Sequence, residues 1–293
     1  MVKPTQRSAA PLGILVSIFC LLGSDAAVSG EISMGEGAEL ANLLNRQFND
    51  ARMSCDGGEA AYKCSGVLMR KSSSAQPNPM ANAAWGYNYT EMQQNSMKFF
   101  YIRADLNNNT VDNHYGDGSH GLLVDGWDKS IQGYCVFPTI GLTTNRDAHG
   151  CGTLRLPGVA YPYIIEPHSW PDFSTCTQRG IHTADEWMKD NELQQTVGKS
   201  DVCSLNPDDT DEFAAFISVA NQLGAEERNE FMMQKWDAQQ PDQLPIQAFW
   251  FVDDQGRQGA KRDQLAYFEA TGVTLPILKY NANSAQPFQA YGE

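Results

Sequence analysis

Apolar and polar residues follow one another along the chain with the two spacings that distinguish helices from strands. In residues 36–53 the apolar side chains recur every three or four positions, which predicts an amphipathic helix. Short apolar or aromatic runs between polar segments predict strands. These strands are expected over residues 62–70, 98–103, 133–138, 246–252 and 275–280.

Helix start signals become frequent in the second half of the chain. Thr183 is followed by Glu186, and Asp209 by Glu212, so each pair has the spacing of a capping box. In such a box the two side chains accept hydrogen bonds from backbone N–H groups that the first helical turn leaves free. Each box therefore predicts the start of a helix.

Two more helices are expected over residues 225–236 and 261–270, and Gly272 is placed to end the second of them. Residues 72–82 and 107–126 are rich in small polar residues and glycine, which predicts loops.

Helices and strands thus mix without the regular alternation of a parallel α/β protein. The chain shows no internal repeat and no sharp change of composition. We therefore predict an α+β fold, with a mixed, largely antiparallel sheet and peripheral helices in a single disulfide-stabilised domain over residues 31–293.

The first thirty residues have the composition of an export signal. Lys3 and Arg7 precede the apolar run 12–22, and small residues follow as far as Gly30. This order is typical of a secretory signal peptide, and the run is shorter than the roughly 20 residues of a membrane-spanning helix. We expect cleavage after Gly30, with Ala27 as the alternative, and a secreted protein (extracellular or periplasmic) without a stable membrane anchor.

Loss of this segment leaves six of the seven cysteines, an even number that favours disulfides formed in an oxidising compartment. The chain has no Cys-x-x-Cys pair, which argues against structural zinc, and we expect no metal site. Many connectivities are open to six cysteines. We expect pairs between sequence neighbours, namely Cys55–Cys64, Cys135–Cys151 and Cys176–Cys203.

Charge and motifs exclude several classes of function. With 21 Lys and Arg against 35 Asp and Glu, the formal charge is −14, so nucleic acid is not an expected partner. The His-Glu-x-x-His motif, the P-loop and the dinucleotide-binding glycine pattern are absent. Residues 118–121 resemble a nucleophile elbow, but Asp117 stands where its first glycine belongs.

Several segments share a likeness to one family. They are residues 64–70, 100–105, 145–152, 229–236, 243–250, 262–272 and 275–277. In this order they resemble halovibrin-like secreted bacterial proteins. The resemblance implies a secreted NAD glycohydrolase or ADP-ribosyltransferase, with NAD as the substrate and no resident cofactor. Arginine-directed transferases carry Glu-x-Glu or Gln-x-Glu, which this chain lacks, so water is favoured over a protein as the ADP-ribose acceptor.

Cleavage of the nicotinamide–ribose bond develops positive charge on the sugar carbon, which a preoriented carboxylate stabilises. We expect Glu230 to supply it and Arg70 to hold the pyrophosphate through its planar guanidinium. Arg70 also resembles the strand-borne arginine of ADP-ribosylating enzymes. This hypothesis requires the two side chains to meet at one pocket; the alternative for Glu230 is an acid on a helix surface.

Four further residues are candidates for substrate binding: Ser65, Arg103, Asn145 and Arg146. For Arg103 the alternative is an ion pair with Asp105 or Asp125. For Asn145 and Arg146 it is capping of the local backbone.

Two other functions stay open. A non-catalytic secreted module could bind glycans or a host surface through the aromatic segment 85–89 and Trp127. An exported effector could instead modify a host or competitor protein.

Overall fold

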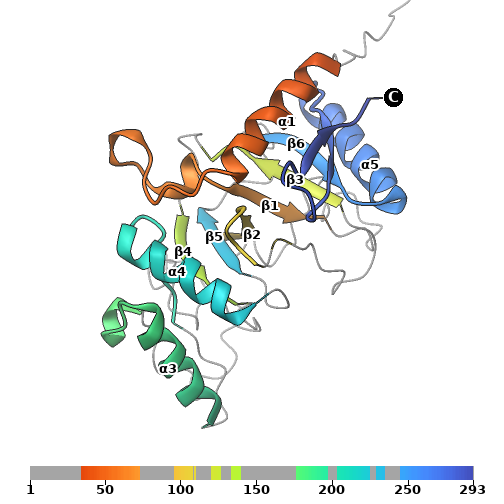
Figure 1. The fold of residues 1–293 in the computed structure, drawn as a ribbon. Helices are drawn as coiled ribbons and strands as arrows, with labels where there is room; N and C mark the ends of the chain where they lie inside the picture. Colours follow the sequence, from red (N-terminus) through yellow and green to blue (C-terminus); the bar gives the residue numbers. More distant parts are fainter. Residues whose placement is uncertain are drawn as a thin grey trace, which may run out of the picture. The chain divides into compact units, whose positions relative to one another are not determined.

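A mixed sheet of eight strands forms the centre of this computed structural model (Figure 1). The structure describes residues 34–72, 96–107, 109, 120–126, 133–139, 176–196, 203–224, 229–234 and 245–292. These residues belong to one compact unit. The predicted α+β class, with a single disulfide-stabilised domain, is confirmed.

The strands are joined antiparallel except at one pair. In spatial order they are β4 (Gly133–Phe137), β5 (Glu230–Gln234), β2 (Ser96–Ile102), β1 (Val67–Lys71), β3 (His120–Val124), β6 (Ile246–Phe251), β7 (Ile277–Tyr280) and β8 (Phe288–Ala290). Strands β6 and β7 run parallel, and the chain between them contains helix α5 (Asp254–Thr271). This helix thus serves as the crossover connection that a parallel pair requires.

One face of the sheet packs against helix α1 (Met34–Phe48). Leu44 and Phe48 belong to the same buried cluster as Trp250, Leu278 and Tyr280, which project from β6 and β7. The helix forms here because its apolar side chains fall on one stripe, as the sequence predicts. We call this side of the sheet the α1 face.

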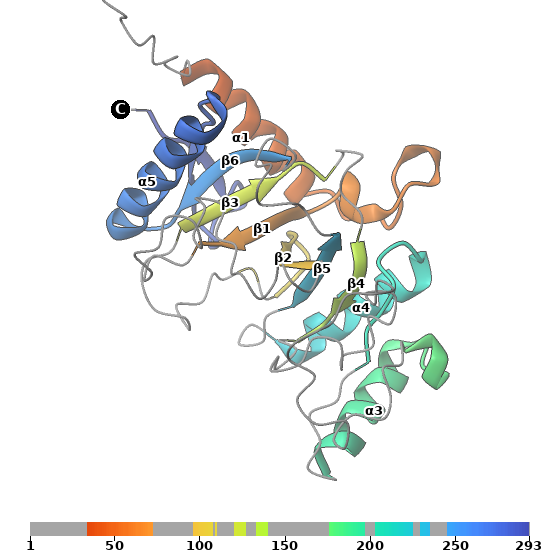
Figure 2. The same cartoon turned by 180° about the vertical axis from the view of Figure 1, so that it is seen from behind.

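The opposite face packs against α4 (Thr210–Leu223) and α5, and we call it the α5 face. Phe213 of α4 meets Tyr101 of β2 edge to face at 5.6 Å, and Tyr267 of α5 meets Phe249 of β6 at 6.0 Å. In the reversed view of Figure 2, α5 lies in front of β3 and β6. Helix α3 (Ala184–Thr196) packs on α4.

Both predicted capping boxes start helices. Thr183 accepts from the N–H of Glu186, and Glu186 accepts in return from the N–H of Thr183 at 3.0 Å. Asp209 caps α4 by accepting from the N–H of Glu212 at 2.9 Å, whereas the Glu212 carboxylate accepts from the N–H of Asn206 instead. The second box is therefore only half formed.

Two of the three expected disulfides are present. Cys55 bonds to Cys64 and Cys176 to Cys203, with Cα–Cα distances of 5.8 and 4.9 Å. Cys135 is also disulfide-bonded, and its expected partner Cys151 lies outside the described residues. Disulfides are typical of proteins that fold in an oxidising compartment. Among the described residues, no helix has both the length and the apolar character to cross a bilayer.

Two predictions of local structure are wrong. The helix expected over residues 225–236 is replaced, from Glu230 to Gln234, by strand β5, because this segment pairs with β2 on one side and β4 on the other. Such pairing outweighs a local helical pattern. The loop expected over residues 107–126 contains strand β3, which lies between β1 and β6.

Three element boundaries also shift by five residues or more. Helix α1 ends at Phe48, before the expected end at residue 53. Strand β1 begins only at Val67, because residues Ala61–Lys63 form a short 3-10 helix. Helix α5 begins at Asp254, seven residues before the expected start, where Asp253 caps it. It ends where expected, with Gly272 in the left-handed conformation (φ 74°).

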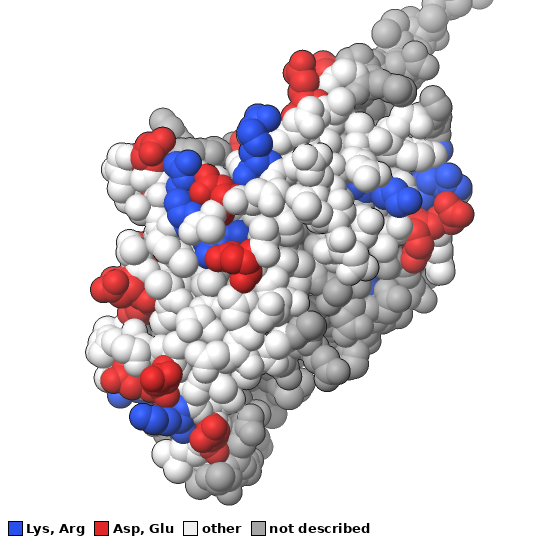
Figure 3. Space-filling view, in the orientation of Figure 1, with Lys and Arg blue, Asp and Glu red and all other residues white. Residues whose placement is uncertain are grey.

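Charged side chains on the face shown in Figure 3 form small groups in which both signs mix. The groups lie toward the margins, around a wide central area without charge. The acidic residues that the structure describes on that side are therefore not collected into one acidic surface.

Candidate functional site

The two expected catalytic residues lie on strands that are not neighbours in the sheet. Met69 of β1 pairs with Phe100 of β2, which places the next β1 residue, Arg70, beside Phe99. Phe99 in turn pairs with Phe231 of β5. Because side chains alternate along a strand, Arg70 shares its face with Phe231, a core residue of the α5 face.

Glu230 lies on β5 and pairs with Phe137 of β4, a core residue of the α5 face. Strand β2 lies between β5 and β1, the strand that carries Arg70. Arg70 and Glu230 are both buried, and two strand spacings separate them within the sheet. That the two side chains meet at one pocket stays a prediction.

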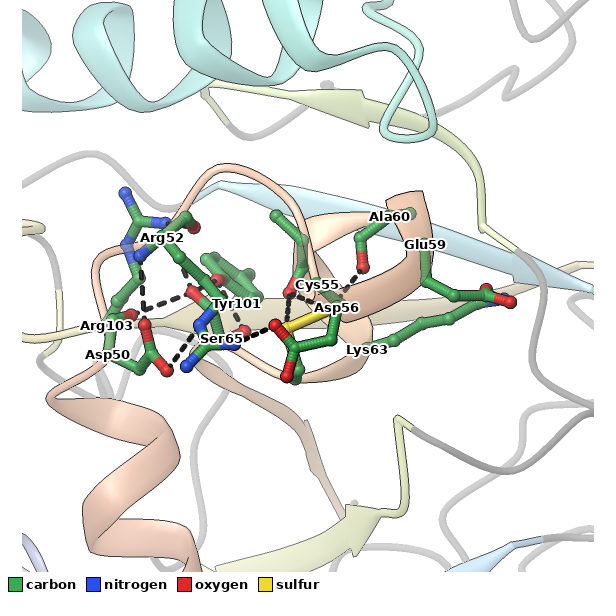
Figure 4. Close-up of a disulfide and its surroundings, with 12 residues drawn as sticks. Asp50, Arg52, Cys55, Asp56, Glu59, Ala60, Lys63, Ser65, Tyr101 and Arg103 are labelled. Atoms are coloured by element: carbon green, nitrogen blue, oxygen red, sulfur yellow. Dashed lines mark hydrogen bonds and ion pairs between the residues drawn. A yellow bond between two sulfur atoms is a disulfide. The ribbon is translucent and has the colours of Figure 1, made fainter.

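Arg103 and Ser65 do come together, in a network close to the disulfide Cys55–Cys64 (Figure 4). The Arg103 guanidinium is completely buried and donates from Nε and Nη2 to the two carboxylate oxygens of Asp105, at 2.5 and 2.8 Å. Its Nη1 donates to Ser65 Oγ at 3.3 Å and to the carbonyl of Arg52 at 3.2 Å. The alternative expected for Arg103, an ion pair with Asp105, is confirmed.

Tyr101 completes this network from β2. Its hydroxyl donates to the carbonyl of Ser65 at 2.7 Å, and burial raises the pKa of Tyr101 to about 12. Gly66 lies against the ring: a Cβ atom there would come within 2.2 Å of it, and its φ is 67°. Arg103 and Ser65 thus anchor the segment before β1. Asn145 and Arg146 lie outside the described residues.

A different group of polar residues converges on the α5 face. Ser72 follows β1, and its N–H donates to the carbonyl of His120, the first residue of β3, at 2.9 Å. Asp263 reaches both from α5: its Oδ2 lies 3.6 Å from His120 Nε2, and its carboxylate accepts a hydrogen bond from the Ser72 side chain. Arg70 precedes Ser72 by two residues and so projects from the same face.

These four residues, Arg70, Ser72, His120 and Asp263, are called the polar cluster below. Arg70, Ser72 and His120 are buried, and the Asp263 side chain is 17% exposed. Along β1, Arg70 and Ser72 are separated by about 7 Å of strand. The cluster thus collects a guanidinium, a hydroxyl, an imidazole and a carboxylate where the end of β1, the start of β3 and helix α5 meet.

Glycine allows α5 to lie directly on this cluster. A Cβ atom at Gly259 would come within 2.4 Å of the His120 imidazole, so only glycine lets the helix backbone approach the ring this closely. Gly121 plays the same part between strands, since a Cβ atom there would lie 1.9 Å from the carbonyl oxygen of Arg70. That carbonyl also accepts from Trp250 Nε1 at 3.2 Å. The backbone beneath the cluster is therefore fixed from both faces.

Burial raises the pKa of Asp263 to about 7, although the hydrogen bond from Ser72 and the charge of Arg262 favour the ionised form. Asp263 Oδ2 is buried and has no hydrogen-bond partner among the described residues. A carboxyl group with a pKa near neutrality exchanges protons readily at physiological pH, which is the property of a general acid or base. The described residues hold no group of three His, Cys, Asp or Glu side chains suited to a metal ion.

Sequence reasoning missed this cluster, apart from Arg70. Ser72 lies in a segment predicted to be a loop, His120 in the segment compared with a nucleophile elbow, and Asp263 in a predicted helix. No fixed spacing relates these three residues. The one sequence signal for the cluster was His120, which stands next to Gly121 in the segment 118–121 that resembles a nucleophile elbow. The register between β1 and β3 brings Ser72 to His120, and the packing of α5 brings Asp263 to both; no local pattern encodes either.

No protein-family model matches the chain, and no curated protein matches it. The resemblance to halovibrin-like proteins therefore stays a prediction.

Proposed function

We propose that this chain is a secreted enzyme that hydrolyses NAD at the nicotinamide–ribose bond, with the polar cluster as its catalytic centre. The observation that carries the proposal is the meeting of Asp263 with Ser72 and His120 on the α5 face, from which Arg70 also projects by strand alternation. The likeness of the sequence to halovibrin-like proteins supplies the substrate class. The disulfides are in keeping with an exported protein.

In this proposal Asp263 takes the part first expected of Glu230. The bond from nicotinamide nitrogen to ribose carbon breaks with its electron pair going to nicotinamide, which leaves neutral. The ionised carboxylate of Asp263 stabilises the cationic sugar carbon, because a charge held in a desolvated site acts strongly. Water then attacks that carbon and gives its proton to Asp263, which later releases it to solvent. The products are nicotinamide, ADP-ribose and one proton.

The other members of the cluster bind and orient. Arg70 pairs with phosphate oxygens of the substrate, since its planar fork matches two oxygens at once. The Ser72 hydroxyl holds the Asp263 carboxylate by its hydrogen bond. His120 Nε2 lies 3.6 Å from Oδ2 and borders the other side of the same carboxylate.

The proposal is tested by measuring nicotinamide release from NAD by the purified mature protein. Asp263→Asn removes the carboxylate while keeping its shape, and we expect turnover to fall at least about a hundredfold. Glu230→Gln is the matched control, because this acid is also buried but lies on β5, two strands away from β1, and we expect turnover to be retained. Loss of turnover in Glu230→Gln with full turnover in Asp263→Asn would return the catalytic role to Glu230.

The choice of acceptor is read from the same reaction. With labelled NAD and added candidate proteins, we expect the label in free ADP-ribose rather than on protein. The glycan-binding alternative rests on residues 85–89 and Trp127, which lie outside the described residues. It predicts no nicotinamide release by the wild-type protein.

A further inference from the structure

Tyr291, which directly follows the edge strand β8, lies on the α5 face of the sheet. The preceding residue, Ala290, faces α1, because its Cβ lies 3.6 Å from where a Cβ atom at Gly37 would stand. Side chains alternate along a strand, so Tyr291 points the other way, and there it packs against the buried cluster of the α5 face. Its N–H donates to the carbonyl of Ile277 at 3.1 Å, which continues the pairing of β8 with β7. The edge of the sheet thus fixes the backbone of Tyr291.

The ring of Tyr291 contacts both β6 and α5. It packs edge to face on Phe251, with 5.2 Å between the ring centroids. The guanidinium carbon of Arg257 lies 5.9 Å, and Nζ of Lys261 5.7 Å, from its centroid. The ring attracts a cation held over it at this distance. Because the two cations stand one helical turn apart, a single ring holds two successive turns of α5 to β6.

These contacts lie on the side of α5 that is turned away from the polar cluster. Gly259 is two residues from each of the two cations, and side chains two positions apart on a helix point in nearly opposite directions. Gly259 meets the His120 imidazole, and Asp263, one turn further along the helix, lies beside the same ring. The helix is therefore held between Tyr291 on one side and His120 on the other.

The part of α5 that follows Asp263 has an anchor of its own. There the side-chain amide of Gln264 donates to the carbonyl of Leu275. The turns before Asp263 are those that the ring of Tyr291 contacts. A shift of these turns away from the sheet would open space beside His120 and let water reach the carboxylate.

We propose that Tyr291 is a positioning residue for the polar cluster, and that it acts through α5. Its ring keeps the first turns of the helix seated on β6, so that Asp263 stays beside His120 and is shielded from water. Tyr291 itself does not touch the substrate. The consequence for catalysis rests on the proposed function, whereas the consequence for the surroundings of Asp263 does not.

The inference is tested by NMR titration of the Asp263 carboxyl carbon in protein labelled at its aspartate side chains, with Asp263→Asn to identify the signal. Burial raises the pKa of Asp263 to about 7. Water that enters beside the carboxyl in Tyr291→Ala should lower this midpoint by about one pH unit. Tyr291→Phe keeps the ring and should titrate as the wild type does. Gln289→Ala, at an exposed position of β8, is the matched control and should change nothing.

The variants leave in place the charged and titratable groups that surround this carboxyl. Arg70 and Ser72 come from β1, His120 from β3 and Arg262 from α5 itself. A changed midpoint therefore reports the placement of the helix and not the loss of a charge.

Hydrolysis of NAD gives a second readout. Ionised Asp263 is the active form in the proposed mechanism, so the acid limb of the pH profile of kcat should move to lower pH in Tyr291→Ala. At the optimal pH, kcat should fall about tenfold, because the carboxylate is held less closely. A merely structural role would lower the melting temperature and move neither titration. If circular dichroism shows Tyr291→Ala to be unfolded, Tyr291→Leu takes its place, since leucine keeps an apolar contact with Phe251 and removes the ring from the two cations.

The outcomes separate this inference from the proposed function. An Asp263 midpoint that stays at the wild-type value in the folded variant without the ring overturns the positioning role, and so does a Tyr291→Phe variant that shifts as far as Tyr291→Ala. If the midpoint stays while the wild type hydrolyses NAD, only the positioning role fails. If the midpoint moves but the wild type releases no nicotinamide, the positioning role is supported and the proposed function fails.

Discussion

Asp263 connects the proposed chemistry to the stability of the protein, because burial raises its pKa from 3.8 to about 7. Between these two values the folded state binds more protons than the unfolded state. The free energy of unfolding therefore falls as the pH rises through this window, by up to about 4 kcal/mol if the whole pKa difference contributes. A buried acid that lowers stability in this way is common at functional sites.

We expect Asp263→Asn to remove this pH dependence, because a neutral amide of the same shape does not titrate. Urea unfolding at pH 4.5 and 7.5 measures it. The variant should equal or exceed the wild type in stability at the higher pH and show a smaller difference between the two. An identical pH dependence in both proteins would mean that Asp263 titrates normally in the folded state.

Arg103 illustrates what residue type and local sequence can reveal. An arginine at the end of a strand, two residues before an aspartate, suggests an ion pair, and the bidentate contact with Asp105 has that form. The depth of its burial does not follow from the local sequence, since it depends on Ser65 and on Phe213, whose ring lies 5.9 Å away on α4. Local patterns thus identify partners close in sequence better than those that packing brings in.

At the scale of elements, the contact of α5 with β3 decides whether the polar cluster forms. Gly259→Ala places a methyl group within 2.4 Å of the His120 ring, so the helix or the imidazole must shift. We expect a loss of stability of about 1–3 kcal/mol, with weaker NAD turnover, because overpacking displaces the groups around it. Thermal unfolding and nicotinamide release measure the two effects.

Gly37→Ala is the matched control, a second helical glycine packed against neighbours. There the nearest atoms to a new Cβ lie at 3.6 and 3.8 Å, an ordinary contact distance. Alanine also favours helix over glycine, by about 1 kcal/mol. A stable Gly37→Ala together with a stable, fully active Gly259→Ala would show that α5 does not need its close approach.

The elements also show where local sequence is sufficient. Capping boxes at Thr183 and Asp209 predict two helix starts correctly, because the interactions that define them lie within four residues. Strand β5 could not be predicted in this way, since residues 230–234 become a strand only by pairing with β2 and β4. Strand β3 could not be predicted from local sequence for the same reason. Both segments matter for the candidate residues, because His120 begins β3 and Glu230 begins β5.

At the scale of the whole molecule, one sheet is shared by two buried clusters. Residues of β1 alternate between them: Leu68 faces the cluster under α4 and α5, and Met69 the cluster under α1. Two layers that share every central strand cannot separate without breaking the sheet. The expectation of a single domain, which composition supports only weakly, follows from this alternation in physical terms.

Hydrogen exchange tests this cooperativity directly. We expect the amides of β1 and β3 to exchange only through global unfolding, because both strands are central and buried on both faces. The amides of β8, a three-residue edge strand, should exchange through smaller openings. Under native conditions with increasing denaturant, the free energies of opening for β1 and for β5 should merge at one value. Two plateaus, one for β4 and β5 and another for β6 and β7, would show that the halves of the sheet unfold separately. The polar cluster, whose residues come from β1, β3 and α5, would then belong wholly to one half.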